Sequence, residues 1–309
     1  MRETDLFTPP HQLKIPVLFL IFNRLDTTKQ VFEEIRQAKP PRLYIAADGA
    51  RTERPGEDQK VKVVREYVLN SIDWDCEIKT LFRDKNLGCK YAVSGGITWF
   101  FEHEEMGIIL EDDCLPSQSF FWFCEELLER FKDDKRVMII SGYNKQQTWN
   151  EDKYDYFFSH FGGIWGWATW KRAWDCYDGN MSELQFCIDN NYLKYLLGEQ
   201  LGRIREGQLI DTINRNIDSW DFPWGFSRHL NSGMACVPSK SLITNIGFGS
   251  DATHTKKYDG IHIIRHEIEF PLRENRIIIA DRRYDLLFHQ KKGFIDGFIS
   301  KIISYFIDK

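Results

Sequence analysis

Residues 16–22, PVLFLIF, form a continuous apolar run that begins with a proline. The run is too short to cross a bilayer and does not alternate with polar residues, which is typical of a strand buried on both faces of a parallel sheet. Strand-like and helix-like patterns then alternate along the chain. Strands are predicted at 43–47, 76–82, 107–110 and 137–141, and helices at about 26–37, 59–70, 91–101 and 117–131. This alternation predicts an α/β fold in which helices flank a mostly parallel sheet.

The character of the sequence divides the chain into four parts. A polar leader, 1–14, precedes the regular α/β half at 15–145, and an aromatic- and glycine-rich half follows at 146–285. Within that second half a long helix is predicted at about 183–206. The last part, 286–309, has apolar residues at helical spacing and is predicted to be an amphipathic helix. It could make a peripheral contact with a membrane, although its weakly basic polar positions favour packing on the protein.

Composition excludes several classes of protein. The chain has 309 residues, of which 42% are hydrophobic and 28% charged, as is usual for a globular protein rather than a disordered one. Its formal net charge of −5 argues against a nucleic-acid-binding protein. Seven cysteines without a CxxC pair predict neither a zinc site nor a disulfide framework. Because the first residues also lack the apolar segment of a secretory signal, we expect a cytoplasmic protein.

Polar or charged residues follow each predicted strand of the α/β half. The carboxyl ends of parallel strands meet at one edge of a sheet, and ligands of such sheets bind there. The residues in these positions are Asn23-Arg24, Asp48-Gly49, Arg83-Asp84, Glu111-Asp112-Asp113 and Gly142-Tyr143-Asn144. The sequence therefore predicts a binding site along this edge.

The segment ILEDDC, 109–114, places three carboxylates directly after a buried strand: Glu111, Asp112 and Asp113. A divalent cation would relieve their mutual repulsion, and Mg²⁺ and Mn²⁺ are typically held by one or two carboxylates together with substrate phosphates. Such an ion would neutralise the charge on a diphosphate leaving group. The alternative is an acidic loop that only stabilises the start of the next helix. These residues by themselves do not decide between the two interpretations.

Several segments, taken in order, resemble the motifs of GT-A-fold, nucleotide-sugar-dependent glycosyltransferases. The closer resemblance is to the β-1,2-N-acetylglucosaminyltransferase I family and its bacterial relatives. It covers roughly residues 15–255, and the EDD context and the GFG loop are its most specific parts. The matching segments are LIFNR (20–24), AADG (46–49), ILEDDCLPSQSFF (109–121), SGYN (141–144), FGGIWGWATWKRAW (161–174), SWDFPW (219–224) and SLITNIGFGSDATH (241–254).

On the donor side, the resemblance implies a role for each matching residue. Arg24 would meet the donor phosphates, Asp48 would hold the uridine, and Asp113 would be the direct metal ligand. The α/β half would then be the half that binds the nucleotide sugar. Further candidates for the nucleotide-sugar site are Glu111, Asp112 and Lys90.

On the acceptor side, the resemblance makes Asp221 the catalytic base. The family has paired aspartates after the tryptophan, whereas here only Asp221 follows it and Asp218 lies three residues earlier, so the identity of the base stays open between them. Trp165 and Trp167 are candidates for stacking on an acceptor sugar, with core packing as the alternative. His254, at the end of the matching loop, is a candidate second metal ligand.

The resemblance implies a metal-dependent inverting glycosyltransferase that uses Mn²⁺ or Mg²⁺. It would move a hexosyl or N-acetylhexosaminyl group from a nucleotide-diphosphate donor, with UDP-sugars favoured, to a glycan acceptor in polysaccharide biosynthesis. Two alternatives stay open. A nucleotidyltransferase would usually carry a glycine-rich basic loop where this chain has FNRLD, 22–26. A non-catalytic carbohydrate-binding or scaffold protein would turn over no nucleotide sugar.

Overall fold

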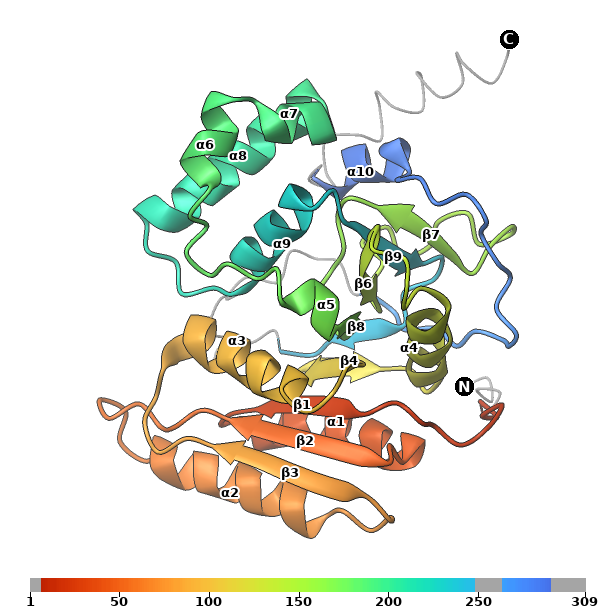
Figure 1. The fold of residues 1–309 in the computed structure, drawn as a ribbon. Helices are drawn as coiled ribbons and strands as arrows, with labels where there is room; N and C mark the ends of the chain where they lie inside the picture. The colour runs from red at the N-terminus through yellow and green to blue at the C-terminus, as the bar shows by residue number, and fades with distance from the viewer. Residues whose placement is uncertain (1–6, 248–262, 290–309) are drawn as a thin grey trace.

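One eight-stranded sheet forms the centre of the computed structural model, which describes residues 7–247 and 263–289 (Figure 1). Its strands are β1 (Val17–Ile21), β2 (Arg42–Ala47), β3 (Glu77–Phe82), β4 (Met106–Glu111), β6 (Val137–Ser141), β7 (Tyr156–Ser159), β8 (Trp167–Trp170) and β9 (Met234–Pro238). They lie in the order β3-β2-β1-β4-β8-β6-β9-β7. A separate antiparallel pair is formed by β5 (Cys114–Pro116) and β10 (Ile243–Asn245).

Most strands of the large sheet share one direction. The strands β1 to β4 pair in parallel, β8 runs against both β4 and β6, and β9 is parallel to β6. The edge strand β7 is antiparallel to β9, so six of the eight strands point the same way. The predicted α/β fold with a mostly parallel sheet is therefore confirmed. The sheet draws β7, β8 and β9 from the second half of the sequence and joins both halves into one hydrogen-bonded layer.

Helices cover both faces of the sheet because successive strand residues point to opposite sides. On β1, Val17, Phe19 and Ile21 belong to one hydrophobic core, together with residues of α1, α2 and α4. Leu18 and Leu20 belong to a second core on the other face, together with residues of α3, α5 and α9. The helices are α1 (Leu25–Ala38), α2 (Glu57–Asn70), α3 (Gly88–Phe101), α4 (Ser119–Arg130), α5 (Lys171–Trp174), α6 (Leu184–Asp189), α7 (Tyr192–Leu197), α8 (Glu199–Asn214), α9 (Asp221–Leu230) and α10 (Arg282–Phe288).

The long helix predicted at 183–206 is wrong: the chain forms α6, α7 and the start of α8 there. Asn191 has φ of 59° and Gly198 has φ of 75°, so both residues adopt backbone conformations that an α-helix cannot contain. The apolar spacing on which the prediction rested continues across these breaks. The three helices fold back beside one another as a small layer above α9 (Figure 1).

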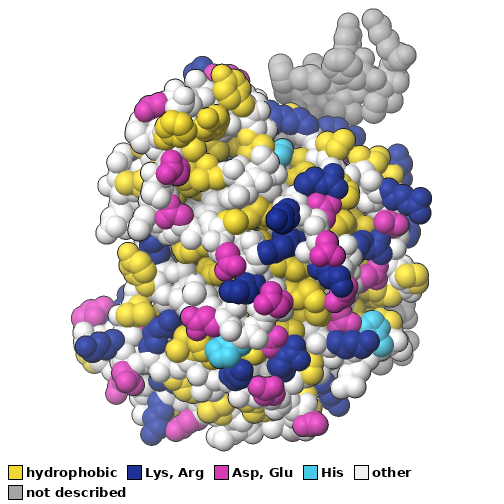
Figure 2. Space-filling view, in the orientation of Figure 1, with side chains coloured by type: hydrophobic (Ala, Val, Ile, Leu, Met, Phe, Trp, Pro, Cys, Tyr) yellow, Lys and Arg dark blue, Asp and Glu magenta, His cyan; other side chains and the backbone are white. Residues whose placement is uncertain are grey.

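The two ends of the chain are described only in part. In the leader, Leu13 is buried and the backbone amide of Lys14 donates to Glu125 of α4 at 2.7 Å. At the other end, α10 includes the first residues of the predicted amphipathic helix, and the rest of that helix lies outside the described residues. Among the residues that the structure does describe, no helix has both the length and the apolar character needed to cross a membrane. On the face seen in Figure 2, acidic and basic side chains are interspersed.

Trp167 lies in the core, which corrects its predicted role in acceptor binding. It belongs to β8, a strand between β4 and β6 that the sequence analysis had not predicted. Its side chain is 0% exposed, and its ring stacks on Trp220 with 5.5 Å between centroids. Trp174 and Trp224 pack on it as well. A ring enclosed on all sides by protein has no surface left for a sugar.

We expect Trp167→Ala to lower the free energy of unfolding by about 3–5 kcal/mol, because a buried indole would leave a cavity among three other tryptophans. Urea unfolding measures this loss. Tyr195→Ala is the matched control, since that ring is 78% exposed and its loss should change the free energy of unfolding by less than about 0.5 kcal/mol. Equal effects of the two substitutions would contradict the core placement of Trp167.

Candidate functional site

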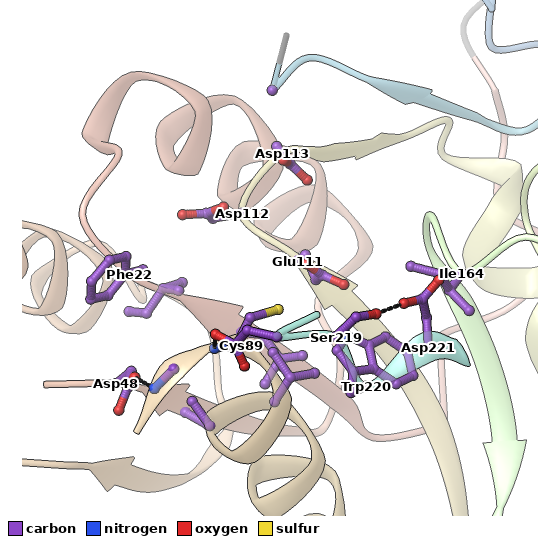
Figure 3. A pocket seen from close by; sticks show the side chains of 18 of the residues that line it. Phe22, Asp48, Cys89, Glu111, Asp112, Asp113, Ile164, Ser219, Trp220 and Asp221 are labelled. Carbon is purple, nitrogen blue, oxygen red and sulfur yellow. Dashed lines mark hydrogen bonds between the residues drawn. The ribbon is translucent and has the colours of Figure 1, made fainter. Parts of the chain in front are cut away.

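A pocket of about 600 Å³ opens at the carboxyl ends of β1, β2 and β4 (Figure 3). Four of its lining residues, Arg24, Asp48, Asp112 and Asp113, follow these strands in the sequence, and Glu111 ends β4. Other walls come from the start of α3, the segments before α9 and before β8, and the residues at the end of β10. The topology thus brings together three of the five strand ends at which the sequence analysis placed a binding site. Arg83-Asp84 and Gly142-Tyr143-Asn144 do not line this pocket.

Two of the three carboxylates at the end of β4, Asp112 and Asp113, pair with one arginine. The guanidinium of Arg24 donates to Asp112 and lies 2.9 Å from Asp113 Oδ2. Asp112 is only 3% exposed, and its Oδ2 atom has no hydrogen-bond partner among the described residues. Asn245, on β10, approaches Asp113 Oδ1 at 3.4 Å. One positive charge therefore faces three acidic side chains.

Burial shifts the protonation of this group. Loss of solvent raises the pKa of Glu111 to about 8, and repulsion from Asp113 and Asp112 adds to the rise. Burial likewise raises the pKa of Asp112 to about 6, although Arg24 opposes the shift. Burial acts to lower the pKa of Arg24, but Asp112 and Asp113 outweigh it and raise that pKa. The surroundings therefore do not stabilise three negative charges at this place, and Glu111 is largely protonated at neutral pH.

A hard divalent cation fits this set of oxygen atoms. The unpartnered Oδ2 of Asp112 and the carboxylates beside it are the oxygen ligands that Mg²⁺ and Mn²⁺ prefer. Within the described part of the chain, no group of three or more His, Cys, Asp or Glu side chains is arranged to hold a metal by itself. An ion bound here would therefore share its coordination with oxygens of a substrate. His254, the predicted second ligand, lies outside the described residues.

Asp48 is held in place by backbone amides at the start of α3. Its carboxylate accepts hydrogen bonds from Leu87 at 2.9 Å, from Gly88 at 3.1 Å and from Gly49 at 3.0 Å. These amides oppose the effect of burial, which still raises the pKa of Asp48. The side chain lines the pocket but is only 9% exposed. The structure therefore fixes the position of Asp48 and leaves only a small part of its carboxylate open to a ligand.

Asp218 binds the next two amides of the same helix. Its carboxylate accepts from Cys89 and Lys90, each at 2.8 Å. Gly88, which precedes Cys89, has φ of 79°, and a Cβ at this position would lie 2.7 Å from Asp218 Oδ2. Both observations favour glycine here. Two carboxylates thus satisfy the exposed amides at the N-terminus of α3. The ammonium group of Lys90 lies over the ring of Tyr91, and Lys90 is not among the residues that line the pocket.

Asp221 lies on the opposite side of Glu111 from Asp48 (Figure 3). Unlike Asp218, it accepts no hydrogen bond on its carboxylate from a backbone amide of the described residues. It is the first residue of α9, and its Oδ1 atom accepts a hydrogen bond from the Ser219 hydroxyl. The side chain lines both this pocket and a second cavity of about 350 Å³ beside it. The sequence analysis left two aspartates as candidates for the base. The carboxylate of Asp218 accepts hydrogen bonds from two backbone amides, whereas Asp221 lines both cavities.

Trp165 lies where the two cavities meet. It lines both of them and packs on Tyr143, with 4.5 Å between ring centroids. Unlike Trp167, it is only half-buried. Trp165 therefore lies where it could contact an acceptor, because it lines the same two cavities as Asp221. Its role in acceptor binding stays a prediction.

The sequence analysis missed three features of the site. Cys89 lines the pocket, and burial, followed by repulsion from Glu111, raises the pKa of its thiol. Gly247 passes so close to the carboxylates that a Cβ there would lie 2.1 Å from Asp113 Oδ2. The sequence analysis named the segment 241–254, which contains Gly247. It did not predict that β10 in this segment pairs with β5, because the two strands are far apart in the sequence. The third feature is a pair of buried arginines, Arg205 and Arg228, that line the second cavity and that the sequence analysis did not single out.

A search with models of known protein families finds no match to this chain, and a search of curated protein sequences finds none either. Among solved structures, the glycosyltransferase GlyE of Streptococcus pneumoniae TIGR4 is similar at a TM-score of 0.36 and 10% identity, over 73% of this chain and 45% of that one. The structure of UDP-glucose pyrophosphorylase complexed with UDP-glucose is similar at a TM-score of 0.31 and 12% identity, over 53% of this chain and 79% of that one. HddC from Yersinia pseudotuberculosis is similar at a TM-score of 0.31 and 9% identity, over 51% of this chain and 77% of that one. Scores this low establish neither a shared fold nor a shared function.

We expect Asp218→Ala to lower the free energy of unfolding by about 1–2 kcal/mol, because two amides at the start of α3 lose a charged acceptor. Chemical denaturation followed by circular dichroism measures the change. The control is Asp211→Ala, which removes only a surface ion pair with Arg215 and should cost less than about 0.5 kcal/mol. An unchanged stability of the Asp218 variant would show that its carboxylate does not hold the helix.

Proposed function

We propose that this chain is a glycosyltransferase that uses a nucleoside-diphosphate sugar, with a UDP-sugar as the favoured donor. The observation that carries the proposal is the buried group Glu111-Asp112-Asp113 with one arginine, at the carboxyl ends of parallel strands and across the pocket from Asp221. The carboxylate group with its arginine suits a cation and a diphosphate, and Asp221 suits proton transfer. Together they would serve the transfer of a sugar from a nucleotide to a hydroxyl group.

The donor would bind with its diphosphate against the carboxylate group. Asp112 and Asp113 would hold Mn²⁺ or Mg²⁺, which when bound neutralises charge on the departing diphosphate. Arg24, already at 2.9 Å from Asp113, would contribute a second positive charge and bidentate donors for phosphate oxygens. Asp48, held by three backbone amides, would orient the uridine at the far end of the pocket.

Asp221 would act as the general base. Its carboxylate would take the proton from an acceptor hydroxyl while that oxygen attacks the anomeric carbon from the side opposite the diphosphate. A single displacement of this kind inverts the anomeric configuration. The Ser219 hydroxyl donates to one oxygen of Asp221 and would keep the other directed toward the acceptor. Trp165 offers an aromatic face for that sugar beside the base.

Isothermal titration of UDP with Mn²⁺ tests the donor site. We expect metal-dependent binding to the natural protein and a loss of about tenfold or more in Asp113→Ala, since the ion would lose one of its two proposed carboxylate ligands. Asp175→Ala, at an exposed ion pair with Lys171, should bind as the natural protein does. Absence of UDP binding by the folded natural protein would contradict the proposal and favour a carbohydrate-binding or scaffold protein.

Asp221→Asn tests the base separately from the donor site. We expect kcat for sugar transfer to fall by about 10²- to 10⁴-fold, because the amide cannot accept the proton, while UDP binding is unchanged. Turnover is measured as release of UDP in the presence of acceptor glycans. Release of pyrophosphate from a nucleoside triphosphate and a sugar phosphate would instead identify a nucleotidyltransferase. Retention of full activity would exclude Asp221 as the base.

A further inference from the structure

The second cavity carries two buried arginines that have no acidic partner. Arg228 of α9 is 4% exposed and Arg205 of α8 is 8% exposed, and both line this cavity. Neither forms an ion pair with any residue that the structure describes. The Nε and Nη1 atoms of Arg228 and the Nε atom of Arg205 also lack hydrogen-bond partners in the described part of the chain. Buried guanidinium groups usually carry such partners, because an unpaired buried charge is costly.

Further basic side chains line the same space, which we call the basic cavity. His229 is 4% exposed, and its Nδ1 atom has no described partner while its Nε2 atom meets the His160 carbonyl at 3.1 Å. The Nε2 atom of His289 is likewise buried without a described partner. The cavity is therefore lined by Lys145, Arg205, Arg228, His229 and His289, and Asp221 is the single acidic side chain in its wall among the described residues.

Electrostatics within the basic cavity are unfavourable in the ligand-free protein. Burial lowers the pKa of Arg228 to about 9, and Arg205 adds to the effect. Burial lowers the pKa of Arg205 to about 10, opposed by Asp221. Both arginines still carry their charge at neutral pH, and the positive charges of Arg205 and Arg228 lower the pKa of His229 in addition to its burial. An anion in the cavity would supply the countercharge that the protein itself does not.

We propose that the basic cavity binds a carboxylate or phosphate group of the acceptor, which makes the acceptor an acidic glycan. This inference rests on the proposed function, because only glycosyl transfer gives the cavity an acceptor to hold. The position of the cavity favours the acceptor over the donor. It is separated from the carboxylate pocket by Asp221 and Trp165, which line both spaces, so an anion held by Arg228 would present a neighbouring hydroxyl to Asp221.

The two arginines are not equivalent as targets for mutation. Arg205 donates to the Phe222 carbonyl at 3.2 Å and to Gln208 at 3.4 Å, so it also supports the surrounding structure. Arg228 makes no such bond to a described residue and lies over the Trp224 ring, 6.0 Å from its centroid. Arg228→Met therefore removes the charge and retains most of the packing volume. Arg172 provides the matched control, because it is half-buried and donates to four backbone carbonyls.

The test is thermal unfolding in D-glucuronate, glucose 6-phosphate or neutral glucose at constant ionic strength, without nucleotide. We expect the Tm of the natural protein to rise with one or both anions and not with glucose. The sugar acid and the sugar phosphate separate the two sources of charge. For Arg228→Met we expect a Tm at least as high as that of the natural protein without ligand, and at least a tenfold loss of anion affinity. Arg172→Met should unfold earlier but keep the full rise with anion.

Three results would overturn the proposal. The first is no rise in Tm with either anion, and the second is an equal rise in Arg228→Met. The third is an Arg228 variant that is destabilised as much as Arg172→Met or does not fold, since that would assign Arg228 a structural role. Because no nucleotide is present, the thermal-unfolding test is independent of UDP binding. Anion binding without UDP binding would contradict the proposed function and with it the assignment of the anion to an acceptor, and only anion binding by the basic cavity would be retained. UDP binding without anion binding would contradict only the proposal for the basic cavity.

Discussion

The repulsion among three carboxylates at the end of β4 is the constraint on which the rest of the site depends. A strand with a buried centre ends in Glu111, Asp112 and Asp113, of which Asp112 is buried and the other two are half-buried. Among the described residues, Arg24 is the one cation that forms an ion pair with this group, through Asp112 and Asp113. Arg24 itself follows the neighbouring parallel strand, so the order of the sheet creates the pairing. Proteins retain such poorly balanced buried charge mainly at functional sites.

A second imbalance, of opposite sign, lies next to the first. The carboxylate pocket has an excess of negative charge and the basic cavity an excess of positive charge, and Asp221 and Trp165 lie at their boundary. The fold keeps the two charged regions apart by placing α9 and Trp165 between them. Each region would be stabilised by a ligand of the complementary kind: a cation with a diphosphate on one side and an anionic sugar on the other. The proposed reaction takes place where these ligands meet.

The sequence predicted the α/β half of the fold because most of its strands are apolar runs that alternate with helices of periodic apolar spacing. It also predicted that Arg24, Asp48 and the carboxylates would meet, since that follows from parallel strand ends alone. It failed where tertiary contacts decide the structure. The WATW segment of β8 looked like an aromatic loop, and its position between β4 and β6 gives it long-range partners that no local pattern records.

The same limit applied to individual site residues. Asp218 reads as one more turn aspartate, and only the folded chain brings it to the amides of Cys89 and Lys90. An arginine in a polar helix is ordinarily a surface residue, so the burial of Arg205 and Arg228 carried no signal in the sequence. Trp165 and Trp167 are two residues apart with equivalent chemistry. One lines both cavities and the other is enclosed, because β8 begins at Trp167.

The most direct test of the account is a crystal structure of the protein with Mn²⁺ and UDP, with the metal located by anomalous scattering. The account predicts one manganese peak against the Asp113 carboxylate, bridged to the diphosphate of UDP, with Arg24 beside the phosphates and uridine toward Asp48. A manganese ion elsewhere, or UDP bound away from the end of β4, would contradict the claim that the buried carboxylates form a nucleotide-sugar site.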